Sequence, residues 1–136
     1  MLVCDTSGLV AYFDASDAHH LAVSAIIQPD PGPFIVSPYV VAELDYLLAS
    51  RRGVQAELAV LTALASGAWE LVCCDSTDLR QAQSIVQRYR DQDIGLTDAS
   101  LVLLCARYRT DRLLTLDRRH FQVVRTMTGE AFKILP

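Results

Sequence analysis

Basic residues are absent from the first fifty positions of this chain, and the first of them is Arg51. The whole sequence has one lysine, Lys133, and its sixteen acidic and twelve basic side chains give a net charge of −4. Nucleic-acid-binding proteins usually carry a basic excess, so the overall charge argues against that class. The average conceals a split, because residues 51–136 carry all twelve bases and only ten of the acids.

Cysteine motifs and long apolar runs are also scarce. The four cysteines form no C-x-x-C pair, and Cys73 and Cys74 are adjacent, so we expect free thiols in a reducing compartment. All four lie in apolar runs, where a thiol packs as a small buried hydrophobe. The N-terminus has no basic region ahead of an apolar core, and no apolar run is long enough to cross a bilayer. We therefore expect a soluble, cytoplasmic protein with no signal peptide and no membrane contact.

The motifs of several phosphate-handling classes are missing. There is no G-x-G-x-x-G and no G-x-x-x-x-G-K, which excludes dinucleotide-binding and P-loop domains. A haloacid-dehalogenase-type phosphatase needs D-x-D after its first strand, but Ser7 stands where the second acid should be. A response-regulator receiver domain needs a lysine after a late strand, whereas Lys133 lies inside the last apolar run.

Apolar runs and helix-period segments alternate along the chain. The hydrophobic fraction of 51% is enough to build a core, and the length of 136 residues fits one domain spanning 1–136. We expect Thr97 to cap the helix that starts at residue 98. The alternation predicts an α/β fold with a mainly parallel sheet. The expected strands are 1–4, 34–37, 69–73, 112–116 and 132–135, and the expected helices are 7–14, 18–28, 38–50, 54–66, 76–90 and 98–108.

Four acidic side chains from distant segments are expected at one edge of this sheet. Asp5 and Asp117 follow predicted strands, Asp98 opens a helix, and Glu43 lies near the apolar stripe of another helix. Ligand sites in parallel α/β sheets lie outside the carboxyl ends of the strands. Converging carboxylates repel each other without a cation between them, and hard oxygen ligands suit Mg²⁺ or Mn²⁺. Taken singly, each acid also has an ordinary explanation as a helix cap, a turn residue or the partner of an arginine.

The segments that carry these acids resemble PIN-domain ribonucleases, and more narrowly the VapC toxins of bacterial type II toxin–antitoxin systems. They are M-L-V-C-D-T-S-G-L-V, V-A-E-L, G-L-T-D-A-S-L and T-L-D-R-R-H-F, in this order over essentially the whole chain. The resemblance implies a three-layer α/β/α PIN-like domain with a sheet of about five strands. It also implies a metal-dependent endoribonuclease that leaves 5′-phosphate and 3′-hydroxyl ends. By position, the catalytic quartet is Asp5, Glu43, Asp98 and Asp117, with Asp5 and Asp98 closest to the metal and the other two as further candidate ligands.

The same resemblance implies roles for further residues. Thr6 matches a small hydroxyl residue beside the first aspartate, which is expected to orient the groups around the metal. Asp93 matches a position that is only sometimes acidic, and it is either an accessory residue or a solvated loop charge. His120 is expected next to the site, as a phosphate contact or as a surface histidine.

Half of all positive charge falls within residues 107–125. Arg118 and Arg119 immediately follow Asp117, and these two, together with Arg112, are expected to bind RNA phosphates. An ion-paired, solvated face is the ordinary alternative for each arginine.

The resemblance also implies partners. These are an RNA substrate, a cognate VapB-type antitoxin whose C-terminal segment lies over the acidic groove, and a second copy of the chain in a homodimer and a larger toxin–antitoxin assembly. The alternative function is a non-catalytic PIN-like module that acts only through protein contacts. Binding of Mg²⁺ or Mn²⁺ would distinguish the two.

Overall fold

A computed structural model describes all 136 residues of the chain. Five strands form one sheet in the order β3-β2-β1-β4-β5, and every neighbouring pair is parallel. The predicted α/β fold with a parallel five-stranded sheet is therefore confirmed. The strands are β1 (Leu2–Cys4), β2 (Phe34–Val36), β3 (Trp69–Leu71), β4 (Arg112–Leu114) and β5 (Lys133–Leu135).

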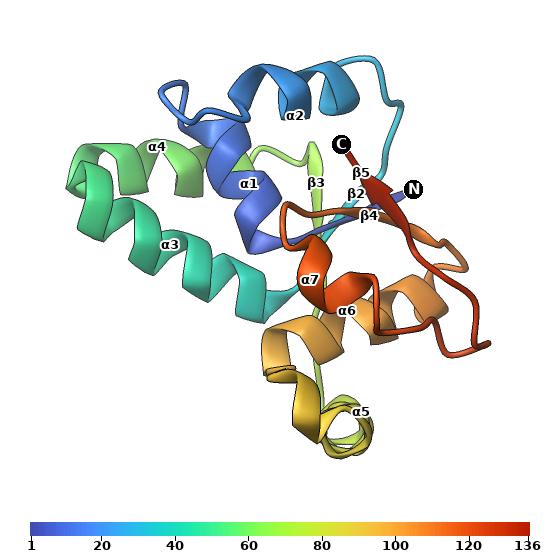
Figure 1. The fold of residues 1–136 in the computed structure, drawn as a ribbon. Coiled ribbons are helices and arrows are strands. Elements are labelled where there is room, and N and C mark those ends of the chain that lie inside the picture. Colours follow the sequence, from blue (N-terminus) through green and yellow to red (C-terminus); the bar gives the residue numbers. More distant parts are fainter.

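Helices cover both faces of the sheet, as Figure 1 shows. Helices α1 to α4 lie on one side, where α3 and α4 pack as a pair and α1 contacts both α2 and α3. Helices α5 and α6 pack together on the other side. The bounds are α1 (Thr6–Phe13), α2 (His20–Ile27), α3 (Pro38–Arg52), α4 (Val54–Leu64), α5 (Ser76–Arg88), α6 (Leu96–Arg107) and α7 (Arg118–Phe121), with a short 3₁₀ turn at Arg90–Gln92. No helix combines the length and the apolar character that crossing a bilayer requires.

Burial on both faces explains why the central strands read as unbroken apolar runs. All of Leu2–Cys4 is buried, and so are Leu113 and Leu114 of β4. Helix α6 runs against β1 and β4, and its residues 99–105 are all buried. This packing holds the first turn of α6 at the carboxyl ends of the two central strands.

The start of α1 is fixed against β4 by a glycine. A Cβ atom at Gly8 would lie 2.8 Å from Cγ of Leu114 and 3.1 Å from its carbonyl oxygen. Only a residue without a side chain allows this approach. The close contact brings the residues at the start of α1 next to the segment that follows β4.

Several local expectations were wrong. Helix α6 begins at Leu96 with Gly95 as its cap, so Thr97 is inside the helix and does not cap it. The short helix α7 was not predicted, because four residues are too few for a periodic signal. All four cysteines are unpaired, but Cys73 is exposed and Cys74 is only partly buried, so these two do not pack as core residues. Each strand is three residues long, because the strand ends pass directly into caps and turns.

Candidate active site

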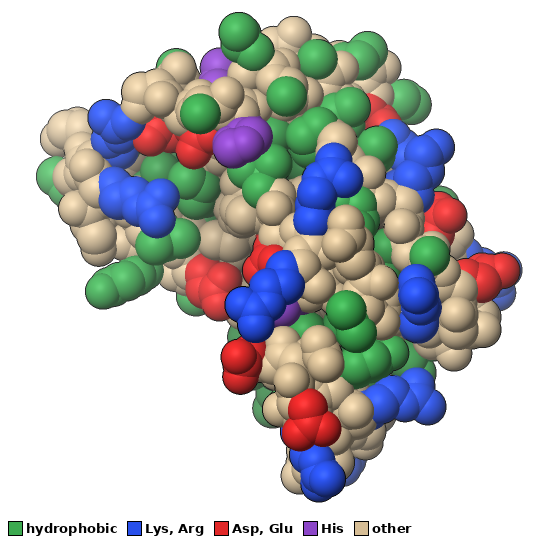
Figure 2. Space-filling model, viewed as in Figure 1, with side chains coloured by type: hydrophobic (Ala, Val, Ile, Leu, Met, Phe, Trp, Pro, Cys, Tyr) green, Lys and Arg blue, Asp and Glu red, His purple; other side chains and the backbone are tan.

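A cleft of about 600 Å³ opens at the carboxyl ends of β1 and β4, between α1 and α3 on one side and α6 and α7 on the other. Figure 2 shows acidic side chains gathered near the middle of this face, next to a histidine and with basic side chains on both sides. Sixteen residues line the cleft: Asp5, Thr6, Ser7, Val10, Asp17, Glu43, Leu47, Arg51, Asp93, Gly95, Leu96, Thr97, Asp98, Leu116, Asp117 and His120.

Asp5 is the most buried of the acids, with 6% of its surface exposed. It follows β1 directly and caps α1, so its Oδ1 accepts the Thr6 backbone N–H at 2.7 Å. Its Oδ2 accepts the hydroxyls of Ser7 at 2.7 Å and Thr115 at 2.6 Å. The Ser7 hydroxyl in turn accepts the backbone N–H of Leu116 at 3.0 Å. The carboxylate is therefore held in one orientation by the first turn of α1 and by the segment that follows β4.

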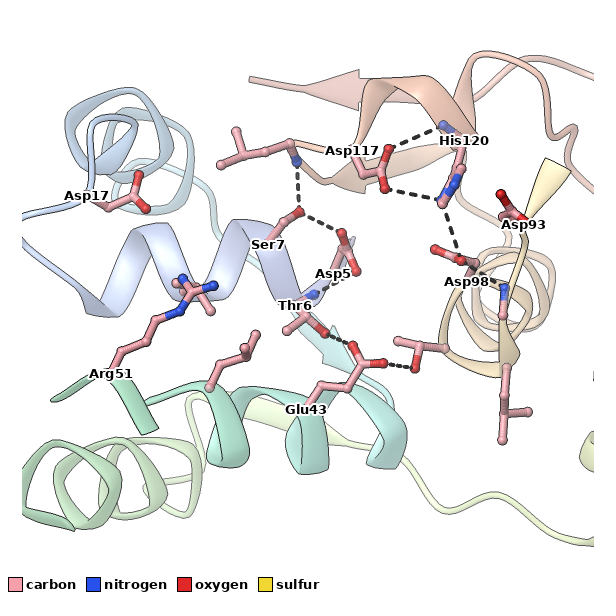
Figure 3. Close-up of a pocket in the computed structure, with 16 residues that line it drawn as sticks. Asp5, Thr6, Ser7, Asp17, Glu43, Arg51, Asp93, Asp98, Asp117 and His120 are labelled. Atoms are coloured by element: carbon pink, nitrogen blue, oxygen red, sulfur yellow. Dashed lines mark hydrogen bonds and ion pairs between the residues drawn. The ribbon is translucent and has the colours of Figure 1, made fainter. Parts of the chain in front are cut away.

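Glu43 reaches the cleft from the second turn of α3. Its Oε2 accepts the Thr6 hydroxyl at 2.7 Å, and its Oε1 accepts the Thr97 hydroxyl at 2.6 Å. These two bonds tie α1, α3 and α6 together through one carboxylate, as Figure 3 shows. Glu43 was expected near or inside the buried stripe of its helix; it lies outside the buried residues Val40, Leu44 and Leu48 and is exposed to the cleft.

Asp98 and Asp117 approach the cleft from the α6 and α7 side. Oδ2 of Asp98 accepts the Gly95 backbone N–H at 3.1 Å, which closes the first turn of α6. Asp117 caps α7 and accepts the backbone N–H of His120 at 3.3 Å. Nδ1 of His120 lies 3.1 Å from Oδ2 of Asp117 and 3.6 Å from Oδ2 of Asp98. This nitrogen is buried and makes no well-formed hydrogen bond.

Burial and like charge raise the pKa of two of these acids. For Asp5 the main cause is burial; the hydrogen bonds from Ser7, Thr115 and Thr6 oppose the rise, and the charge of Glu43 adds to it. For Asp98 burial is again the main cause, and the charges of Asp5 and Asp117 add to it, while the Gly95 N–H and His120 oppose it. The ionised forms of Asp5 and Asp98 are thus disfavoured, mainly by burial and further by the neighbouring carboxylates.

This donor set fits a hydrated divalent cation. Neither Asp5 nor Glu43 forms an ion pair with an arginine or lysine. No three acidic, histidine or cysteine side chains converge tightly enough to enclose a metal ion by themselves. Mg²⁺ needs no such enclosure, because it keeps several waters and binds through one or two carboxylates and the substrate's phosphates.

Some of the predicted site residues line the cleft, and others lie beside it or far from it. Asp5, Glu43, Asp98, Asp117, Thr6 and Asp93 all line the cleft. Arg118 and Arg119 are exposed on α7 beside the cleft without lining it, and the Arg118 guanidinium donates to the carbonyl of Pro136. Arg112 was wrongly grouped with them. Arg112 begins β4, whereas Asp117 follows the carboxyl end of that strand, so the two residues lie at opposite edges of the sheet. At its own edge Arg112 forms an ion pair with Asp30 at 2.5 Å.

Four lining or supporting residues were missed from the sequence. Ser7 and Thr115 orient Asp5, and Thr97 orients Glu43. Their signal was present, because each lies within two residues of a quartet acid in the motifs D-T-S, T-D-A and T-L-D. Arg51 had no such signal, since it lies eight residues from Glu43 and reaches the cleft only through the helical arrangement of α3.

Comparisons with known proteins identify the family of the chain and proteins of similar fold. The chain matches the PIN domain family over residues 2–126. It is 54% identical to Ribonuclease VapC26 of Mycobacterium tuberculosis (strain ATCC 25618 / H37Rv) over 135 residues, which cover 99% of this chain and 100% of that protein. The fold is similar to the crystal structure of Mycobacterium tuberculosis VapC20, described as a sarcin-ricin loop cleaving toxin, with a TM-score of 0.85, 19% identity and full coverage of both chains. It is also similar to a chain of a toxin–antitoxin complex from Klebsiella pneumoniae, with a TM-score of 0.71, 15% identity and coverage of 91% and 92%.

Proposed function

The chain belongs to the PIN-domain family, and we propose that it is a VapC-type toxin, an endoribonuclease that hydrolyses RNA phosphodiester bonds with the help of Mg²⁺ or Mn²⁺. The single observation that carries the proposal is the convergence of the four acids on one cleft, with a relative named a ribonuclease at 54% identity over nearly the whole chain. The same agreement over 135 residues supports a single PIN-like domain spanning 1–136.

Asp5 and Asp98 would hold the metal ion, and Asp117 and Glu43 would complete its surroundings directly or through water. Both Asp5 and Asp98 have a raised pKa, in part through neighbouring carboxylates, and a bound cation would remove that repulsion. When bound, a divalent ion neutralises charge on the phosphodiester and lowers the pKa of a water. Asp93 is exposed at the cleft edge and would act as an accessory charge.

Hydroxyl side chains of the protein orient the acids of the cleft, and one of these acids would accept a proton. Thr6 and Thr97 fix both oxygens of Glu43, so this carboxylate is placed to accept a proton from the attacking water. Ser7 and Thr115 keep Asp5 from rotating. Attack in line on phosphorus then leaves a 5′-phosphate on one product and a 3′-hydroxyl on the other.

A non-catalytic protein-binding module is the alternative. Such a module has no need for acids whose ionisation is opposed by burial, so the hydrogen-bonded carboxylates of the cleft favour catalysis. Arg118 and Arg119, beside the cleft on α7, would contact the RNA backbone outside the site of cleavage.

The partner proposed for the cleft is a VapB-type antitoxin. A basic segment of such a protein would be attracted to a cleft lined by six carboxylates and would block the RNA from entering. Pairing of two copies of the chain in a homodimer, and their assembly with the antitoxin, belongs to the same proposal. Exposed apolar side chains on the α3–α4 pair, including Tyr46 and Leu58, are available for such contacts.

Mapping of RNA ends tests the function. The chain is expressed in bacteria beside an Asp5→Asn control, and the 5′ ends of cellular RNA are sequenced. We expect new, discrete 5′-phosphate ends only with the unmodified chain. Identical ends in both cultures would contradict the proposal.

A further inference from the structure

One basic side chain, Arg51, lines a cleft that six carboxylates also line. Figure 3 shows Arg51 at the end of the cleft away from Asp98 and His120, extending from α3 towards α1. An RNA strand is an anion at every nucleotide, so its binding in an acidic cleft depends on whatever positive charge is in reach. Arg51 is the fixed positive charge that the cleft offers at this end.

The position of Arg51 follows from the helical repeat of α3. Glu43, Leu47 and Arg51 are spaced four residues apart, and all three line the cleft. Residues at this spacing share one face of a helix. The eight-residue separation corresponds to about 12 Å along the helix axis. Arg51 therefore projects from the cleft wall about two turns further along α3 than Glu43, which places it towards a neighbouring phosphate of a bound strand.

Arg51 also forms no ion pair, in contrast to its neighbour Arg52. Arg52 donates from Nε and from a terminal nitrogen to the two carboxylate oxygens of Asp14, each at 2.9 Å. No carboxylate forms an ion pair with Arg51, although Asp17 lines the same end of the cleft. Because the planar guanidinium matches two phosphate oxygens at once, an unpaired arginine in a cleft is suited to hold a phosphate.

We propose that Arg51 binds a phosphate of the RNA strand next to the one that is cleaved, so that the strand lies along the wall formed by α1 and α3. The inference rests on the proposed ribonuclease function and extends it by giving the path of the substrate. Arg51 is in this view a positioning residue, because it holds a phosphate that does not react. The substrate accordingly extends beyond the cleaved bond by at least one further phosphate.

Cleavage kinetics of Arg51→Ala test this, with Arg88→Ala as the matched control. Arg88 is likewise an exposed arginine in the last turn of a helix, and it lies outside the cleft. We expect Arg51→Ala to raise KM for a single-stranded RNA about tenfold with kcat unchanged, as for the loss of one charge-assisted contact. The slope of log(1/KM) against log salt should become less steep by about 0.7. Arg88→Ala should change neither quantity.

Two further variants exclude a general role in folding. Arg51→Lys keeps the charge and should recover part of the loss in KM. A dinucleotide with one phosphate should be cleaved equally by wild type and Arg51→Ala, because it has no second phosphate to hold. An unchanged KM and salt slope in Arg51→Ala would overturn the inference, and so would an unchanged KM combined with weaker binding of the antitoxin, which would assign Arg51 to a protein contact.

Failure of the proposed ribonuclease function can be distinguished from failure of the inference about Arg51. A wild-type protein that leaves RNA intact would contradict the ribonuclease proposal. Binding of the same RNA in Mg²⁺, measured by fluorescence anisotropy, would then test Arg51 by itself. Weaker binding by Arg51→Ala but not by Arg88→Ala would still support the phosphate contact, and equal binding by all three proteins would overturn it.

Discussion

The hydroxyl of Thr6 donates to Oε2 of Glu43 at 2.7 Å, across 37 residues of sequence. The same threonine donates its backbone N–H to Asp5. One residue at the start of α1 therefore orients two carboxylates, one directly after β1 and one on α3. Since Thr97 holds the other oxygen of Glu43 from α6, three helices share the task of positioning one acid.

Thr6→Val should weaken catalysis without loss of the fold. The valine keeps the branched shape and the backbone N–H, but it leaves Glu43 held by Thr97 alone. We expect kcat/KM for RNA to fall about tenfold, in line with the loss of one hydrogen bond to a charged group. Thr6→Ser keeps the hydroxyl and should retain most of the activity. Equal activity of the valine and serine variants would contradict this role.

Asp98→Asn should raise the thermal stability of the metal-free protein at neutral pH. Burial and the charges of Asp5 and Asp117 raise the pKa of Asp98 in the folded state. Above that pKa the carboxyl is ionised, and its charge lowers the free energy of unfolding. Asparagine removes the charge and can still accept the Gly95 N–H. The Tm should rise by a few degrees in EDTA, and the difference should shrink as pH falls and the wild-type carboxyl becomes protonated. A lower Tm for the variant at neutral pH would contradict the electrostatic account.

Acid should inhibit cleavage at a pH that depends on the metal concentration. Protons and the cation compete for Asp5 and Asp98, whose pKa values burial and neighbouring carboxylates raise from the ordinary aspartate value. At subsaturating Mg²⁺, kcat/KM should fall as pH falls through these raised values. Higher Mg²⁺ should move the acidic limb of the profile to lower pH. A limb that stays in place at all Mg²⁺ concentrations would show that these carboxyls do not bind the metal.

Gly8→Ala should destabilise the protein although alanine favours helices. The new Cβ would lie 2.8 Å from Leu114 Cγ, inside a packed core, and overpacking of this kind reduces stability by about 1–3 kcal/mol. Urea unfolding measures the change in free energy. The double variant Gly8→Ala/Leu114→Val should lose less stability than the sum of the single variants. Additive losses would mean that Gly8 and Leu114 do not restrict each other.

The order of elements was predictable because buried parallel strands and amphipathic helices have distinct periodicities. The acidic quartet was predictable because Asp5 and Asp117 follow strand ends and the topology sends such residues to one edge. Thr97 shows where local rules fail: its cap role was overridden when the Gly95 N–H bonded to Asp98, which started α6 two residues earlier than expected. Arg112 was misplaced because proximity in sequence to Asp117 was taken for proximity in space, although β4 separates them.

RNA cleavage by the purified chain and by Asp98→Asn, each measured over a titration of Mg²⁺, tests the central claim most directly. We predict that the wild-type protein cleaves a single-stranded RNA only when Mg²⁺ or Mn²⁺ is added and leaves 5′-phosphate ends. The Asp98→Asn protein should remain folded and should be inactive at every metal concentration. Undiminished cleavage by the variant, or cleavage by the wild type in EDTA, would contradict the account.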